Sequence, residues 1–154
     1  MSKKAMTCGG AIVLLLIMAT AGLPVHSTAG GLVPDLVVSA IDFKTVSQNV
    51  DAKGNKYWIF DVYITVANIG KGDAGKFKVL LTRNIGPDGS YVQACSACWP
   101  TLDGLRAGER YTLPPFQFNN AMGANCAFNA KADYPGDVDE SDETNNTRTE
   151  TFIR

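Results

Sequence analysis

The chain has 154 residues, with 14 lysines and arginines against 15 aspartates and glutamates, one histidine and four cysteines. This length suits a single domain with one hydrophobic core. Without a basic stripe the chain offers no surface that would neutralise phosphates, so we expect no nucleic-acid partner.

The first 29 residues have the pattern of a secretory signal peptide, including its apolar helix. Lys3 and Lys4 give a positive start, an uncharged apolar run follows over residues 11–19, and Ser27-Thr28-Ala29 offers a cleavage site of small residues. A membrane anchor is the alternative, because residues 5–23 approach the roughly 20 apolar residues of a membrane span. The glycines and the proline around this run favour cleavage. We therefore expect a secreted protein, extracellular or at the cell surface, with the periplasm as a further location.

Cleavage after Ala29 would remove both lysines and His26, the only histidine. Residues 30–154 would then carry 12 basic and 15 acidic residues, a net charge of −3. Catalytic triads and zinc sites that need an imidazole are thereby excluded. Two carboxylates would suffice for a glycosidase, but no predicted loop is long enough to shape a deep cleft. We expect no enzyme.

Alternation of apolar and polar residues predicts an all-β domain. It is clearest over Trp58–Val66, where every second residue is apolar, which indicates a strand with one buried face. No run has helical spacing, and turns rich in Gly, Pro, Asn and Asp separate about seven strands. The pattern predicts one antiparallel Ig-like or fibronectin-III-like β-sandwich over residues 30–154. The expected strands cover residues 34–43, 58–66, 77–81, 91–95, 111–118, 126–132 and 147–153.

Two further features bear on the expected strands: a pair of prolines inside one of them and the position of strands at a sheet edge. Pro114-Pro115 falls inside the expected strand 111–118, so that strand should bulge or lie at an edge. If the chain is a filament subunit, we expect an exposed edge strand at 34–43 or at 147–153.

Four short motifs follow one another along the domain. They are Pro34-Asp35-Leu36, Val66-x-Asn68-x-Gly70, Leu105-x-Ala107-Gly108-Glu109 and Val138-x-Glu140-Ser141-x-Glu143-x-Asn145-Asn146. In this order they resemble the CARDB family, the cell-adhesion-related Ig-like domains of bacteria and archaea. The cysteines and Pro114-Pro115 depart from the family pattern. The resemblance implies an extracellular module used in adhesion, surface display or carriage of other domains, without an active site.

Three cysteines lie in the domain: Cys95, Cys98 and Cys126. A zinc site would need a fourth ligand, and the context of a thioredoxin-like redox site is absent. In an oxidising compartment a structural disulfide is expected. Because Cys126 lies in a core-facing strand pattern, we expect it to pair across the domain with Cys95 or Cys98; a local Cys95–Cys98 bridge is the alternative. Either way one thiol remains, buried or available to cross-link a partner chain.

Six acids gather near the end of the chain and form a candidate calcium site, because calcium takes six to eight oxygen ligands. The spacing is not that of an EF-hand loop, since Arg148 stands where the closing glutamate would be. The alternative is a solvated acidic turn, with Glu143 and the two asparagines bonding backbone donors of the fold. The six acids are Asp133, Asp137, Asp139, Glu140, Asp142 and Glu143.

The two tryptophans differ in their expected roles. Trp58 shares the parity of the buried face, which predicts a core residue. Trp99 lies beside Cys98 and Pro100 in a loop, and it is the better candidate to stack on a sugar.

These patterns favour an exported, non-catalytic Ig-like module that binds a surface protein or carbohydrate. The alternative is a structural subunit of a surface filament or layer, in which an edge strand pairs with a neighbouring copy. In both cases contact with a membrane is expected only through an uncleaved signal segment.

Overall fold

The computed structural model describes residues 31–85 and 90–153. The predicted signal segment lies outside these ranges. The described residues form ten strands and no helix, so they include no helix that could cross a membrane. The strands are β1 (Leu36–Val50), β2 (Lys56–Asn68), β3 (Phe77–Lys78), β4 (Leu80–Asn84), β5 (Tyr91–Gln93), β6 (Thr101–Leu102), β7 (Arg110–Thr112), β8 (Phe116–Ala121), β9 (Cys126–Lys131) and β10 (Thr147–Phe152).

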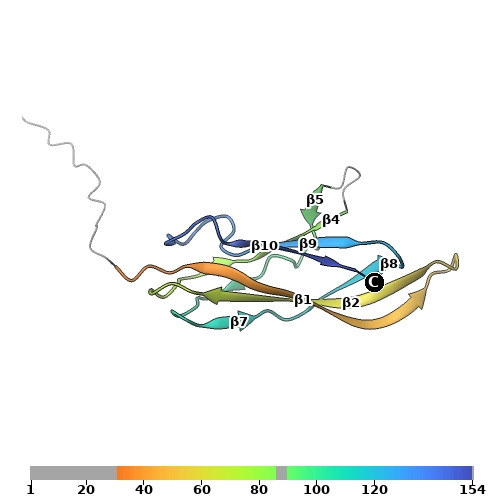
Figure 1. The fold of residues 1–154 in the computed structure, drawn as a ribbon, viewed down its shortest axis with the longest axis horizontal. Coiled ribbons are helices and arrows are strands. Elements are labelled where there is room, and N and C mark those ends of the chain that lie inside the picture. Colours follow the sequence, from red (N-terminus) through yellow and green to blue (C-terminus); the bar gives the residue numbers. More distant parts are fainter. Residues whose placement is uncertain (1–30, 86–89, 154) are drawn as a thin grey trace, which may run out of the picture.

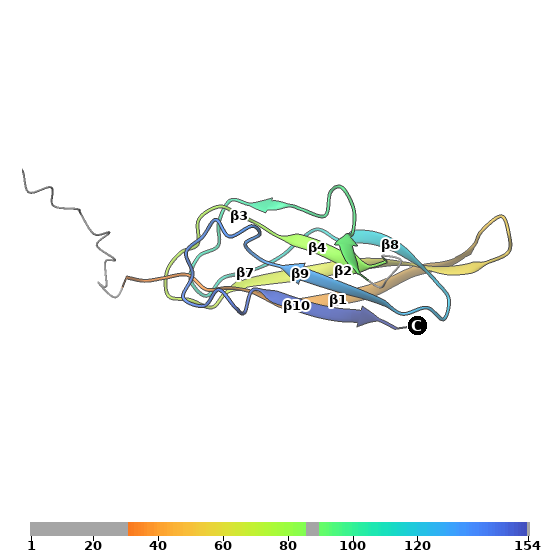
Figure 2. The same ribbon diagram turned by 90° about the horizontal axis from the view of Figure 1, so that it is seen from above.

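Two antiparallel sheets pack face to face, as the alternating pattern predicts (Figures 1 and 2). The first has the order β1-β2-β7, and β8 also pairs with β2. The second has the order β10-β9-β4-β5. The small β3–β6 ladder continues along β4, where the Leu81 N–H donates to the Cys98 carbonyl at 3.0 Å. The predicted all-β sandwich is confirmed.

The core consists of the inward-facing residues of both sheets. At its centre the rings of Phe60 and Phe152 stack at 3.9 Å, which joins β2 of the first sheet to β10 of the second. Cys126 is 2% exposed, which confirms its predicted core-facing position. Trp58 is half-buried and packs against the core. The cluster also includes Leu36, Ile41, Val62, Ile64, Val66, Phe77, Val79, Leu81, Leu102, Phe118, Phe128 and Ala130.

The first strand is longer than predicted. Residues 44–50, expected to be a polar link, belong to β1, which stays paired with β2 up to Val50 and Lys56. Most of these residues are exposed, so burial imposes no alternating pattern that a sequence reading could detect. Together with the facing part of β2 they form an arm that extends beyond the sandwich (Figures 1 and 2).

Two other expectations concern the sheet edges. Pro114-Pro115 separates β7 from β8, which confirms the predicted interruption. Both candidate edge strands, β1 and β10, lie at the edges of their sheets. They lie side by side, and Arg148 of β10 donates from Nη1 to the carbonyl of Ser39 in β1 at 3.1 Å.

Candidate metal centre at the β9–β10 crossing

The crossing between β9 and β10, residues 132–146, lies at the end of the sandwich where β1 begins (Figures 1 and 2). The Ala132 N–H donates to the Asn146 carbonyl at 2.9 Å and closes the base of the loop. Asp133 follows with φ = 47°, the only non-glycine residue of the described ranges in the left-handed region. Aspartate tolerates this region because its short side chain bonds locally.

The Asp133 carboxylate is only 1% exposed and organises the first half of the loop. Its two oxygens accept the backbone N–H groups of Asp137 and Val138 at 3.0 and 3.1 Å. Buried carboxylates need such donors, because taking an unpaired charge out of water is costly. Asp133 therefore serves the fold of the loop before any ligand is considered.

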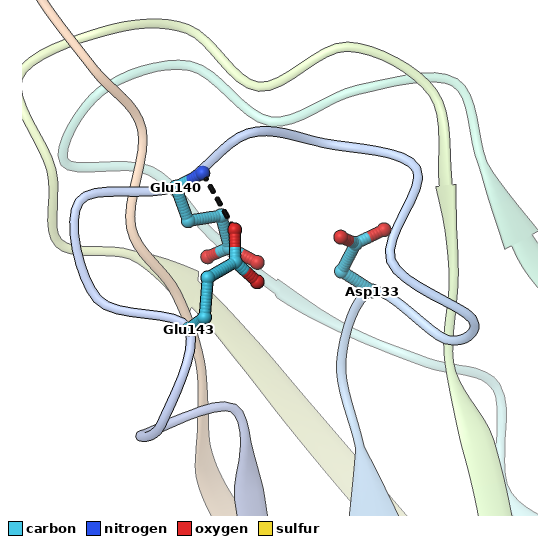
Figure 3. Close-up of side chains that lie close together, drawn as sticks. All are labelled: Asp133, Glu140 and Glu143. Atoms are coloured by element: carbon cyan, nitrogen blue, oxygen red, sulfur yellow. Dashed lines mark hydrogen bonds between the residues drawn. The ribbon is translucent and has the colours of Figure 1, made fainter.

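Glu140 connects the loop to the start of the domain. Its Oε2 accepts the backbone N–H of Leu36, and its Oε1 accepts Asn146 Nδ2 at 2.6 Å. Its own N–H donates to Glu143 Oε1 at 2.9 Å (Figure 3). Burial raises the pKa of Glu140 to about 7, and the nearby Glu143 and Asp133 carboxylates act in the same direction.

Three of the six predicted acids come together. Carboxylate oxygens of Asp133, Glu140 and Glu143 lie within 4.8 Å of one another, and in Figure 3 the three side chains converge inside the loop. Each oxygen has a further lone pair beyond the bond described, so the set could hold a hard cation without losing those bonds. Asp137, Asp139 and Asp142 are exposed and lie outside this group, which we call the carboxylate cluster.

A buried amide adjoins the carboxylate cluster. Asn146 is 2% exposed, and its Oδ1 has no hydrogen-bond partner among the described residues. An unsatisfied buried acceptor is uncommon in folded proteins and calls for an explanation. An amide oxygen is also a ligand that calcium accepts. Both the donor chemistry and the unsatisfied acceptor therefore fit a cation at this position.

The remaining motif residues hold the lead-in to β1 in place. The Ser141 N–H donates to the Pro34 carbonyl at 2.9 Å, and Asn145 Nδ2 donates to Asp35 Oδ1 at 2.8 Å. Of the three side chains expected to bond backbone donors, only Glu143 does so, whereas Asn145 and Asn146 donate from Nδ2 to carboxylates.

Sequence reasoning missed the role of Asn68, which is buried at the end of β2. Its Oδ1 accepts the N–H of Asp35 at 3.1 Å, and its Nδ2 donates to the carbonyls of Gly72 and Leu105 at 2.8 and 2.9 Å. Asn68 thereby connects three of the four motifs. An asparagine that directly follows a strongly alternating strand was the available signal.

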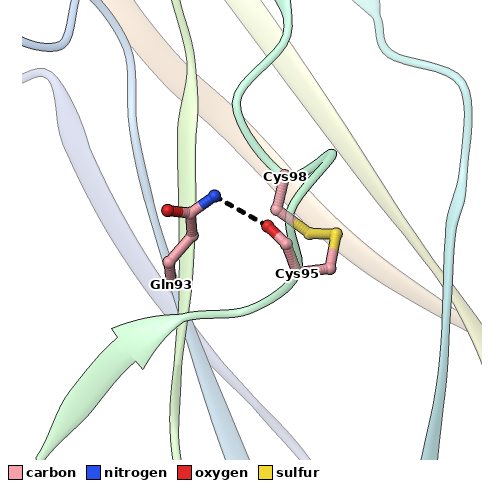
Figure 4. The surroundings of a disulfide bond; sticks show 3 residues. All are labelled: Gln93, Cys95 and Cys98. Atoms are coloured by element: carbon pink, nitrogen blue, oxygen red, sulfur yellow. Dashed lines mark hydrogen bonds between the residues drawn. A yellow bond between two sulfur atoms is a disulfide. The ribbon is translucent and has the colours of Figure 1, made fainter.

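The disulfide differs from the favoured prediction. Cys95 and Cys98 form a local bridge (Figure 4). Cys126 is a buried free thiol. Cys98 lies beside Leu81, and Leu81 pairs with Ala130, four residues along β9 from Cys126. Four strand residues span ~13 Å, which exceeds the Cα–Cα limit of about 7 Å for a disulfide. A cross-domain bridge was therefore the wrong expectation.

Trp99, the predicted stacking residue, follows this bridge and is 40% exposed. Its ring lies 5.4 Å from that of Tyr134, and Lys78 Nζ lies 5.1 Å from its centroid. The Tyr134 N–H donates to the Lys78 carbonyl at 3.1 Å. We call these three residues the Trp99 surface. It adjoins the carboxylate cluster, because Tyr134 directly follows Asp133.

The family model for CARDB matches residues 33–150. The chain belongs to the CARDB family. This is a non-enzymatic β-domain family, and the match spans all four motifs that converge around the crossing and the start of β1. No curated protein matches the sequence.

A solved CARDB domain shows the same fold. The crystal structure of the CARDB domain of the PF1109 protein from Pyrococcus furiosus, in complex with di-metal ions, is 24% identical, with a TM-score of 0.51. The similarity covers 77% of this chain and 86% of that one. A solution NMR structure of the same domain is 22% identical, with a TM-score of 0.48, covering 79% and 94%.

Proposed function

We propose that this CARDB domain is an exported, non-catalytic Ig-like module that binds a carbohydrate or a surface protein outside the cell. The Trp99 surface carries this proposal, because a large aromatic ring remains accessible on a rigid support. The Cys95–Cys98 bridge precedes Trp99, the Tyr134 ring packs against the Trp99 ring at a tilt, and Lys78 Nζ lies over it. Aromatic rings of this kind stack on the apolar faces of sugars and anchor protein interfaces.

The side chains of the crossing support a binding role over a catalytic one. Asp133 and Glu140 already accept backbone or amide N–H groups, which fixes them in the fold. Pairs of catalytic carboxylates need a substrate cleft between them. Here the three carboxylates of the cluster converge on one another within the loop (Figure 3).

A polysaccharide panel tests the stacking role. We expect the purified domain to be retarded in gels that contain a bound polysaccharide, and Trp99→Ala to abolish the retardation. Tyr111→Ala is the matched control, because Tyr111 is an aromatic residue of similar exposure, 47%, on β7. Equal binding by both variants would remove Trp99 from the site.

Fractionation of native cells tests the location. Export predicts a mature species that lacks residues 1–29, in the surface fraction or the medium. Recovery of a full-length chain in the cytoplasm would contradict export.

A subunit of a surface filament or layer is the second candidate. It is favoured by β1, an edge strand of 15 residues whose last part, in the arm, is not flanked by β10. Unprotected strand edges pair readily with other chains. Two β-bulges, at Val38/Ala40 and Thr45/Ser47, interrupt the register of this strand. Such bulges oppose uniform pairing, so we rank this candidate second.

Cross-linking combined with non-reducing gels separates the two candidates. A filament subunit should give a ladder of high-mass species, whereas a binding module should remain a monomer. Because Cys126 is buried, we expect the pattern to be unchanged by reductant. A ladder that collapses with reductant would show that Cys126 becomes exposed and links chains.

We also propose that the carboxylate cluster binds a divalent cation, with calcium as the best fit. Support comes from three convergent carboxylates, the unsatisfied buried Asn146 Oδ1 and the di-metal complex of the related CARDB domain. Three carboxylates this close repel one another, and a divalent ion offsets that repulsion. When bound, the ion would be held by Asp133, Glu140 and Glu143 and would stabilise the crossing against β1.

A further inference from the structure

Arg83 of β4 reaches across the open side of the sandwich. Its Nη2 donates to the carbonyl of Asn119 in β8 at 3.3 Å. Its guanidinium carbon lies 5.6 Å from the ring of Phe118 and 5.7 Å from that of Phe128. The Arg83 side chain therefore connects the two sheets, and its guanidinium lies over the rings of Phe118 and Phe128.

The charge of Arg83 has no anionic partner among the described residues. The ion pairs there join Lys76 to Asp103 and Arg148 to Glu150. In addition, the Arg83 Nε is buried and bonds to no acceptor in the described part of the chain. A guanidinium carries five N–H donors and never loses its proton, so its partial burial is unfavourable until an anion approaches.

Backbone donors of β8 face the same region. The Met122 N–H donates to the Lys56 carbonyl of β2, so alternate residues of β8 point toward β2 and those between them point away. Gln117 and Asn119 belong to the outward set, which agrees with the bond from Arg83 to the Asn119 carbonyl. Since β8 pairs only with β2, the N–H groups of these two residues lie on an unpaired edge.

A pocket lies where these donors meet. It has a volume of about 310 Å³ and is lined by Arg83, Gln117, Asn119, Cys95, Ala94 and neighbouring apolar atoms. Cys95, which is bridged to Cys98, is one of the lining residues. None of the described residues that line this pocket is acidic. We propose that it binds a small oxoanion, the carboxylate or sulfate group of an acidic ligand.

The chemistry of the pocket matches that class of ligand. A guanidinium forms charge-assisted hydrogen bonds with carboxylate and sulfate oxygens, and outward backbone N–H groups add neutral donors to the same anion. Trp99 does not line this pocket, so the oxoanion site is separate from the Trp99 surface and independent of the cation site at the crossing.

NMR titration of the unaltered, isotope-labelled domain tests the proposal directly. The probes are sodium sulfate against sodium chloride at equal ionic strength, and galacturonate against neutral galactose. We expect saturable shifts of the Arg83 Nε–H signal and of the Gln117 and Asn119 amides with sulfate, galacturonate or both. Saturation by galacturonate alone would assign a carboxylate ligand, and saturation by sulfate alone would assign a sulfate ligand. Shifts that fail to saturate, or that spread over all basic residues, would overturn the proposal.

Two variants and a control sharpen the test. Arg83→Gln should weaken the affinity for the effective probe at least tenfold, whereas Arg83→Lys, which keeps the charge without the planar fork, should weaken it less. Arg110→Gln removes an exposed arginine on β7 and should leave the affinity unchanged. Equal weakening by Arg110→Gln would show a nonspecific charge effect and contradict the site. If Arg83→Gln fails to fold, the titration of the unaltered domain remains decisive.

Discussion

Carboxylates organise a turn at each end of this CARDB domain, but they do so in opposite ways. At the tip of the arm, Asp51 accepts the N–H groups of Lys53 and Asn55, both at 2.8 Å. It is fully exposed, and the side-chain hydrogen bond from Asn55 is the main reason that its pKa is lowered. At the crossing, Glu140 is bonded to Leu36, 104 residues away, and burial raises its pKa to about 7.

The difference between the two turns shows how burial changes the role of a carboxylate that accepts backbone hydrogen bonds. Every partner of Asp51 lies within four residues, so that turn forms from local sequence alone. The crossing needs β1 in place before Glu140 can be satisfied. A local turn can be lost with little effect on the domain, whereas the crossing is coupled to the whole fold. The three carboxylates of the cluster, of which Asp133 is buried and Glu140 partly buried, also lie close together without a cationic side chain among them, which favours a cation.

The largest expected difference comes from removing the aspartate at each end. Asp133→Ala leaves the N–H groups of Asp137 and Val138 without their acceptor, which should cost ~2–6 kcal/mol, at about 1–3 kcal/mol for each of the two donors. Asp51→Ala should lower stability much less, because water can replace the lost bonds. Urea denaturation of both variants measures this. Equal shifts of the midpoint would contradict the contrast between the two turns.

Glu140 permits a finer comparison between losing a carboxylate and losing only its charge. Glu140→Ala removes the acceptor of the Leu36 N–H and should cost ~1–3 kcal/mol. Glu140→Gln keeps an oxygen for that bond and resembles the protonated acid, so we expect less than half of that loss. Thermal unfolding of the two variants in parallel decides the order. A glutamine variant as unstable as the alanine variant would mean that the charge, and not the acceptor, is needed.

The raised pKa of Glu140 predicts a pH dependence without added cations. Between its ordinary value of 4.5 and about 7, the folded state binds more protons at this residue than the unfolded state does. Stability from this residue should therefore fall as pH rises through that window. The lowered pKa values of Asp51 and Asp142 act only below their ordinary 3.8, outside the window. In Glu140→Gln this decline between pH 5 and 7 should disappear. Its persistence would assign the effect to another group.

The smallest expected effect on stability concerns Glu143. Its carboxylate is exposed, and the glutamine in Glu143→Gln keeps an oxygen for the Glu140 N–H. Without cations we expect an unfolding midpoint within experimental error of the unaltered domain. A large loss would show that the Glu143 charge serves the fold itself. This variant therefore separates cation binding from folding.

Much of this architecture could be predicted from the sequence. Where one face of a sheet is buried, as over Trp58–Val66, every second residue is apolar. This alternation predicts both the strand and which of its side chains face the core. The long arm of β1 could not be predicted this way, because its half-buried positions, Thr45 and Ser47, are polar and its exposed positions include Val46 and Val50. The Pro114-Pro115 break was predictable, since proline cannot donate to a ladder.

The site was predictable only in part. The acidic run pointed to six residues, but which three converge depends on the left-handed Asp133 and on the distant Leu36 N–H. The pairing of the cysteines depends on how far Cys126 lies along β9 from the Cys95–Cys98 loop. The alternation of residues predicts that Cys126 faces the core, but it does not predict that distance. Arg83 gave no signal at all, because its isolation from acids is a property of the packed sheets.

Calcium titration of thermal unfolding tests the cation site most directly, using the unaltered domain and Glu143→Gln side by side. For the unaltered domain we predict a saturable rise in melting temperature, equivalent to ~2.7 kcal/mol when calcium reaches about 100 times its dissociation constant. For Glu143→Gln we predict the same rise only at calcium concentrations at least tenfold higher. An unchanged melting temperature in the unaltered domain, or identical curves for both proteins, would contradict a cation site at the carboxylate cluster.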